Sequence, residues 1–196
     1  MSLDKVLSNK TYDLLKRYCE ASGIPVRLLN RFKPPMVVLT LLALELQRLG
    51  VDQTGVDIYF HNKATNEGKK VKWLESVKEQ MEFVLSMGKG NENDFIEQSI
   101  RDLKKTKEIT NELIVAWKQG NDDKLYSLFV SQMKDDYPDL YKTMLVERNR
   151  QWLPKIERYV QDSQKELVLI GVGHLVGEEG IIQYLRRQGY RINKLD

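Results

Sequence analysis

An uninterrupted aliphatic run, residues 167–170, passes directly into a glycine-rich turn at 171–177. Such a run is typical of a strand that is buried on both faces of a parallel sheet. Helical spacing over 179–188 and a short alternating stretch at 190–192 follow the turn. This order predicts a strand–helix–strand unit, in which the two strands lie parallel and are joined by a right-handed crossover.

Residues 70–74 alternate polar and apolar side chains and predict one further strand. Most of the remaining chain has helical periodicity between glycine and proline stops. The expected helices cover residues 9–22, 34–49, 53–66, 77–87, 92–119, 121–134 and 138–160. We therefore expect a helix-rich α/β fold, in which a small, mostly parallel sheet is surrounded by many helices.

The bulk composition suits one globular domain over residues 1–196, with 41% apolar and 30% charged residues. The net charge of +3 is small and the charges alternate in sign, so a nucleic-acid partner is not expected. The longest apolar stretch, 36–44, is too short to span a bilayer. Cys19 is the only cysteine, which excludes an internal disulfide.

The first residues, Met1, Ser2 and Leu3, lack the basic stretch and apolar run of a signal peptide. They read like an artificial start that is joined to an interior segment. We expect that native sequence has been removed upstream.

His174 is the strongest candidate for a functional residue, because it follows the carboxyl end of an expected strand, where ligands bind in open α/β sheets. Gly171 and Gly173 lack side chains, so the backbone can turn sharply and a ligand can approach closely. An imidazole here could bind a metal or transfer a proton near neutral pH. Alternatively, the glycines only form a tight turn and His174 caps a helix.

Glu75 ends the other expected strand. If the two strands are parallel neighbours, Glu75 and His174 lie at the same sheet edge, where they suit a metal site or an acid/base pair. Alternatively, Glu75 is a solvated acid that favours the start of the next helix.

Arg148 falls on the apolar stripe of the long helix, in line with Tyr141 and Trp152. A buried guanidinium needs an acidic partner or an anionic ligand. The alternative is that its aliphatic stem packs while the charged end reaches water.

Several motifs occur in an order that resembles the middle and C-terminal half of the TraB/GumN family, which includes the Tiki metalloproteases. The matching segments are 31–35, 55–60, 63–64, 68–69, 74–75, 147–156, 167–180 and 185–190. The family pattern has two Gly-x-x-His motifs, and Gly171-Val172-Gly173-His174 matches the second. The first motif has no counterpart in this sequence, which implies that the chain is incomplete and inactive by itself.

The resemblance implies a metal-dependent hydrolase of peptides that uses Mn, Co or Zn. In this interpretation, His174 is a metal ligand and Glu75 is a metal ligand or a general base. Arg148 pairs with Glu75 or with a substrate carboxylate, and all three residues act in catalysis. The residues expected to bind substrate are Arg148, Asn149, Gly171 and Gly173. The resemblance also implies an extracytoplasmic location for the full-length protein.

Two other functions stay open. One is a non-catalytic protein of the cell envelope that binds a peptide or a glycan, in pheromone shutdown or in exopolysaccharide production. The other is a nucleotide-binding module, although the third glycine of 171–177 is one position late for the dinucleotide fingerprint.

Overall fold

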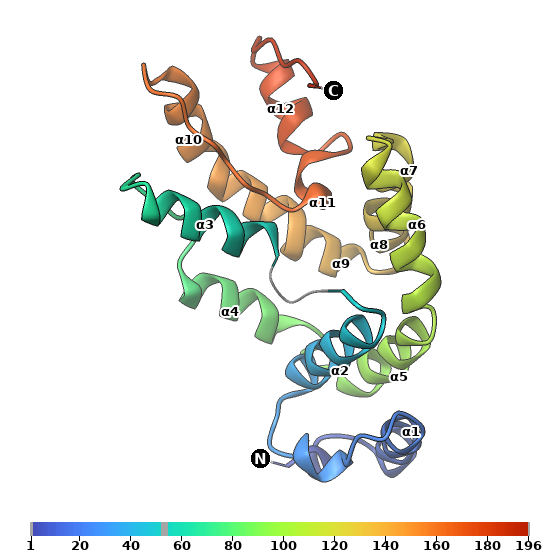
Figure 1. The fold of residues 1–196 in the computed structure, drawn as a ribbon. Coiled ribbons are helices and arrows are strands. Elements are labelled where there is room, and N and C mark those ends of the chain that lie inside the picture. The colour runs from blue at the N-terminus through green and yellow to red at the C-terminus, as the bar shows by residue number, and fades with distance from the viewer. Residues whose placement is uncertain (1, 52–54, 196) are drawn as a thin grey trace. The chain divides into compact units, whose positions relative to one another are not determined.

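The computed structural model describes residues 2–51 and 55–195, which form helices joined by turns and irregular segments (Figure 1). Helix takes up 68% of the chain, and none of the described residues lies in a β-strand. The expected α/β fold with a parallel sheet is therefore wrong. Among the described residues, no helix combines the length and the apolar character that crossing a bilayer requires.

The three segments that were expected to be strands are irregular, but they do carry core side chains. Leu74, Ile170, Tyr190 and Ile192 all pack against one buried cluster on α10 and α12. A strand needs a neighbour to share its backbone hydrogen bonds. The expected full burial of these segments is wrong, because Leu167 and Trp73 are 67% and 69% exposed and the packed side chains are only partly buried, against helices.

The helices match the sequence periodicity more closely. The expected helices 9–22, 34–49 and 77–87 are found with ends shifted by one residue at most. The expected helix 92–119 is divided in two, because α5 ends at Leu103 and α6 begins at Thr106. Of the expected helix 53–66, residues 53 and 54 lie outside the described residues, and the rest corresponds to α3.

The chain divides into two compact units. The first unit is Met1–Gly55 and Val77–Thr110. Its elements are η1 (Leu3–Lys5), α1 (Asn9–Ala21), η2 (Val26–Leu28), α2 (Pro34–Arg48), α4 (Val77–Ser86) and α5 (Glu92–Leu103). Side chains from α1, α2 and α5 form its apolar core, in which Leu15, Val37 and Ile96 are almost fully buried.

The second unit is Val56–Ser76 and Asn111–Asp196. Its helices are α3 (Val56–Asn66), most of α6 (Thr106–Lys118), α7 (Asp122–Tyr126), η3 (Ser127–Ser131), α8 (Gln132–Asp136), α9 (Pro138–Tyr141), η4 (Lys142–Glu147), α10 (Arg148–Gln161), α11 (Val172–Leu175) and α12 (Ile181–Arg187). All of the predicted site residues belong to this unit.

Candidate functional site

The site is built on α10, which follows the π-helical segment η4 without a break. A π turn inserts one residue and rotates the face that follows it. Buried residues therefore step from Tyr141 to Val146 and then to Asn149 and Trp152. The sequence placed Arg148 on the buried stripe, whereas the structure gives that position to Asn149, which is 3% exposed, and leaves Arg148 partly buried beside it.

Arg148 and Glu75 form a bidentate ion pair. Arg148 Nε donates to Glu75 Oε2 at 3.1 Å, and Nη2 donates to Oε1 at 2.6 Å. Both side chains are only 12% exposed, so water screens the pair weakly. Arg148 Nη1 also donates to the carbonyl of Met144 at 3.3 Å, which fixes the guanidinium against its own helix. The structure thus brings Glu75 and Arg148 together, although the expected strand before Glu75 does not exist.

Trp152 links this ion pair to His174. Arg148 Cζ lies 4.8 Å from the Trp152 ring centroid, one helical turn away. The other neighbour of the indole is the His174 ring, with centroids 4.5 Å apart. Trp152 Nε1 is buried and has no hydrogen-bond partner among the described residues. Trp152 therefore lies in contact with both parts of the site, the Arg148 guanidinium and the His174 imidazole.

His174 lies in the one-turn helix α11, and its hydrogen bond with Asn149 determines which tautomer the ring adopts. Asn149 Nδ2 donates to two backbone carbonyls, that of His174 at 3.2 Å and that of Glu179 at 3.0 Å. Because carbonyls only accept, Asn149 Oδ1 must face the ring, and it lies 2.7 Å from His174 Nδ1. The imidazole therefore carries its proton on Nδ1 and keeps a lone pair on Nε2.

The surroundings of His174 hold it neutral. The residue is 7% exposed, and burial lowers its pKa from 6.5 to about 4, with a further contribution from the Arg148 guanidinium. No described residue forms a hydrogen bond with Nε2. At neutral pH, Nε2 is thus a permanent acceptor, which suits a metal ligand or a hydrogen-bond acceptor better than a proton carrier.

Four glycines of the segment 171–180 differ in whether the backbone requires them. Gly171 and Gly173 do not adopt a positive φ, and a Cβ would find room at either position. Gly177 has φ +84° and a Cβ there would come within 2.5 Å of Tyr126. At Gly180 a Cβ would collide with the backbone carbonyls of Leu175 and Val176. The backbone requirement for glycine thus lies at the later two positions.

The donor set does not make a metal site by itself. His174 fits a ligand, because its Nδ1–H is held by an oxygen, as metal-binding histidines usually are. Glu75 fits poorly, since each of its oxygens accepts from the Arg148 cation. The described residues contain no cluster of three or more His, Cys, Asp and Glu side chains. A catalytic zinc ion takes three protein ligands, so one available donor is too few.

A second polar cluster continues from Asn149. Glu179, whose carbonyl accepts from Asn149, receives hydrogen bonds on its carboxylate from Tyr141 and, at 3.3 Å, from Lys134. The Tyr141 hydrogen bond, with help from Lys134, lowers the pKa of Glu179. Burial raises the pKa of the Tyr141 hydroxyl, and the neighbouring Glu179 carboxylate raises it further. Neither residue was singled out from the sequence, where Glu178 and Glu179 look like ordinary surface acids.

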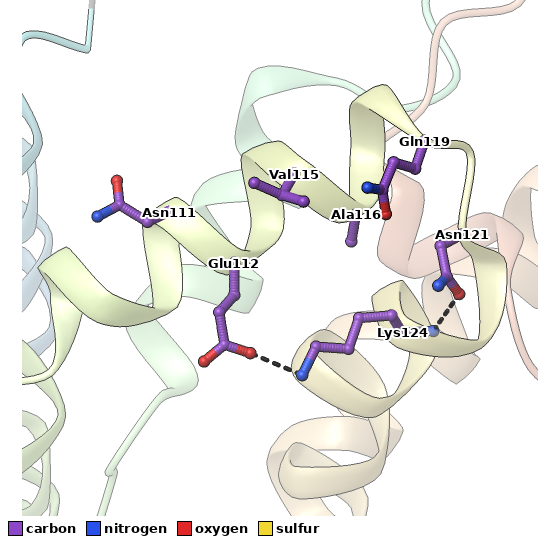
Figure 2. A pocket seen from close by; sticks show the side chains of 7 residues that line it. All are labelled: Asn111, Glu112, Val115, Ala116, Gln119, Asn121 and Lys124. Atoms are coloured by element: carbon purple, nitrogen blue, oxygen red, sulfur yellow. Dashed lines mark hydrogen bonds and ion pairs between the residues drawn. The ribbon is translucent and has the colours of Figure 1, made fainter.

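A cleft of about 430 Å³ lies along α6 and α7 (Figure 2). Its lining residues are Asn111, Glu112, Val115, Ala116, Gln119, Asn121 and Lys124. Figure 2 shows Glu112 and Lys124 pointing toward one another, and their charged atoms are 2.6 Å apart. Because the charges cancel and no predicted site residue lines it, this cleft is not the candidate site.

Comparison with known proteins gives one match. The model of a family described as the TraB/PrgY/gumN family matches residues 1–194. Neither a curated protein nor a solved structure matches the chain.

Proposed function

Because the chain belongs to the TraB/PrgY/gumN family, we propose that it carries the histidine-bearing part of a hydrolase site that acts on peptides. The observation that supports this function is the buried, neutral His174. Asn149 orients its ring, and Nε2 is left as the acceptor. A histidine with a structural role alone does not need an unused lone pair, whereas a ligand or an acceptor for a reacting group does.

The metal-dependent form of this activity is the one that the family resemblance implies. In that form, His174 would supply one nitrogen ligand for Mn, Co or Zn, and a bound metal would activate water. The other ligands would have to come from outside the described residues. The Arg148 guanidinium, which Glu75 holds in place, would contribute positive charge near the imidazole, suited to a substrate carboxylate or to charge that develops on a carbonyl.

The state of His174 can be tested directly by nitrogen-15 NMR of the two histidine rings. We expect the His174 ring to be protonated on Nδ1 only, and added Zn²⁺ to perturb Nε2. His61, the other histidine, is exposed on α3 and supplies the matched control. A ring protonated on Nε2, or a Zn²⁺ effect that survives His174→Ala but not His61→Ala, would contradict the proposed role.

Turnover is the second test. It is measured on a pool of fluorogenic peptides with and without Mn²⁺, Co²⁺ or Zn²⁺, for this chain and for any longer product of its gene. His174→Ala should lower peptide hydrolysis by about 100-fold or more, the usual contribution of a positioned catalytic group. His61→Ala should leave it unchanged. Equal rates for wild type and His174→Ala would exclude this hydrolase site.

A second candidate function is binding of a peptide or glycan without turnover, in the cell envelope. The absence of a metal-ligand cluster from the described residues favours it. This function predicts that a chelator does not change the affinity for the ligand. It also predicts that no peptide is cleaved, whichever metal ion is added. An extracytoplasmic location is part of both proposals and would be tested by fractionation of the producing cells.

A further inference from the structure

A second cleft of the same unit, about 350 Å³ in volume, lies where residues 72 and 73 meet α10. It is lined by Lys72, Trp73, Lys155, Arg158, Tyr159 and Asp162. This volume is within the range of ligand pockets. Neither the Glu75–Arg148 pair nor His174 lines this cleft, so the proposed hydrolase chemistry leaves it without a role.

The charges in this cleft are mostly positive. Lys155 Nζ donates to the carbonyl of Leu74 at 2.5 Å, and Arg158 Nε donates to that of Pro154 at 3.2 Å. Lys72 Nζ lies 5.0 Å from the Tyr159 ring centroid. None of the three cations is within 4.0 Å of a carboxylate of the described residues. Three cations and one carboxylate, Asp162, make this a site for an anionic group.

The backbone beside these cations is also open. Residues 70–73 lie outside the helices, and within the described chain they form no backbone–backbone hydrogen bond. The Trp73 side chain is 69% exposed at the rim. Free N–H and C=O groups beside an aromatic ring match the main chain and side chains of a peptide. A sugar could also stack on Trp73, but it would not use alternating backbone donors and acceptors.

We propose that this cleft binds an acidic peptide, whose main chain bonds to residues 70–73 and whose carboxylate lies among Lys72, Lys155 and Arg158. The peptide class rests on the proposed function, whereas the acidic character follows from the charges of the cleft. Lys155 also donates to the carbonyl that directly precedes Glu75. The cleft would thus hold a peptide next to the Glu75–Arg148 pair and select acidic sequences.

The affinity of the chain for a fluorescein-labelled peptide of alternating glutamate and valine, measured by anisotropy, tests the charges. The double variant Lys72→Gln/Arg158→Gln should bind about tenfold more weakly, because two partly exposed ion pairs contribute roughly that factor. The control Lys118→Gln/Arg187→Gln removes the same charges from exposed positions outside the cleft and outside residues 70–73. It should bind within about twofold of wild type. An equal loss in both double variants would reduce the effect to net charge and overturn the proposal.

The place of binding is tested by intrinsic fluorescence. The unlabelled peptide should quench the wild type and Trp117→Phe but not Trp73→Phe, since Trp117 is similarly exposed, at 62%, and lies on α6. Quenching that survives Trp73→Phe and is lost in Trp117→Phe would place the ligand elsewhere and overturn the proposal.

The class of ligand is tested by two further probes. The same peptide with alternate amides N-methylated should lose most of its affinity, and a sulfated oligosaccharide of equal charge should bind more weakly than the peptide. Unchanged binding of the N-methylated peptide, or tighter binding of the oligosaccharide, would overturn the assignment to a peptide.

This proposal and the hydrolase proposal fail in different ways. His174→Ala should leave peptide binding by the cleft unchanged. Binding without any His174-dependent turnover would defeat the hydrolase alone. Turnover of peptides that ignores both acidic sequence and Lys72→Gln/Arg158→Gln would defeat the cleft alone.

Discussion

The two units bury different kinds of side chain. The first unit has an aliphatic interior, in which Leu15, Cys19 and Val37 are fully buried and the polar Thr11 is bonded to Ser8 and Glu97. The second unit buries the polar His174 and Asn149. Burial of polar groups costs free energy that an apolar core would not cost. Among the described residues, the polar side chains that the first unit buries are the hydroxyls of Thr11 and Thr106, whereas the second unit buries an imidazole and an amide that bond to one another.

The same contrast holds for the two most buried titratable groups. Burial raises the pKa of Cys19 to about 11, and it lowers that of His174 to about 4. Each is therefore neutral at pH 7. Cys19 lies among apolar side chains, where a neutral thiol is inert. His174 instead has an oriented ring with a free acceptor.

The largest effect is expected in the core of the first unit. Leu15 is 0% exposed, so Leu15→Ala should lower the free energy of unfolding by about 3–5 kcal/mol, from lost burial and a residual cavity. Leu28 is 65% exposed, and Leu28→Ala should cost less than about 0.5 kcal/mol. Urea unfolding followed by circular dichroism measures both. Similar costs for the two variants would contradict a close-packed first unit.

In the second unit, the largest effect should come from the weakly screened ion pair. Glu75→Gln removes the carboxylate from a buried guanidinium and should cost about 3 kcal/mol. Replacing both Glu75 and Arg148 by Met should recover most of this loss, because a buried pair adds little net stability over apolar side chains. The matched exposed pair is Lys78–Glu82, where Glu82→Gln should cost less than about 0.5 kcal/mol. If the double variant is as unstable as Glu75→Gln, the two residues do not act as a pair.

The depressed pKa of His174 predicts an acid-sensitive stability. The unfolded histidine binds a proton near pH 6.5 and the folded one near pH 4, so the unfolded state takes up more protons between these values. The stabilisation is complete above pH 6.5 and is lost as the pH falls through 4. Between pH 7 and pH 5 the wild type should lose about 2 kcal/mol more than His174→Gln. Urea unfolding at both pH values measures it, with His61→Gln as control; the same pH dependence in all three proteins would remove the evidence for a buried neutral imidazole.

The helices could be predicted from the sequence because their periodicity is local. The expected sheet was wrong because the pairing of strands is not a local property. An apolar run such as 167–170 predicts burial, but residues 168–170 are only partly buried and Leu167 is 67% exposed. Such a run also does not tell whether a strand or a helix packs on it. Ile170 and Leu74 pack against helical residues such as Trp152 and Ile156. The pairing that defines a strand depends on distant residues, and no local pattern reports it.

The sequence identified part of the candidate site, but the structural argument that was used to select the residues was wrong. His174, Glu75 and Arg148 were selected as residues at strand ends or on an apolar stripe, yet Arg148 and Glu75 meet because residues 74 and 75 pack beside α10. The exchange of Arg148 for Asn149 on the buried face follows from the π turn of η4. A register calculated at 3.6 residues per turn cannot include this inserted residue.

The smallest effect on stability is expected at Tyr141 and Glu179, where the polar cluster of the second unit reaches the surface. Tyr141→Phe removes a hydrogen bond to Glu179, a carboxylate whose side chain is 43% exposed, and should cost about 1 kcal/mol. The same change should raise the pKa of Glu179 toward its ordinary value, which carbon-13 NMR measures. The control in the first unit is Tyr12→Phe, which removes a neutral hydrogen bond to Asn30 of 3.0 Å and should cost a similar amount. Because Glu179 holds Asn149 through its backbone carbonyl, the His174 nitrogen-15 shifts should not change in Tyr141→Phe. A change in those shifts would mean that Tyr141 and Glu179 position His174 as well, and that the functional part of the second unit extends to its surface.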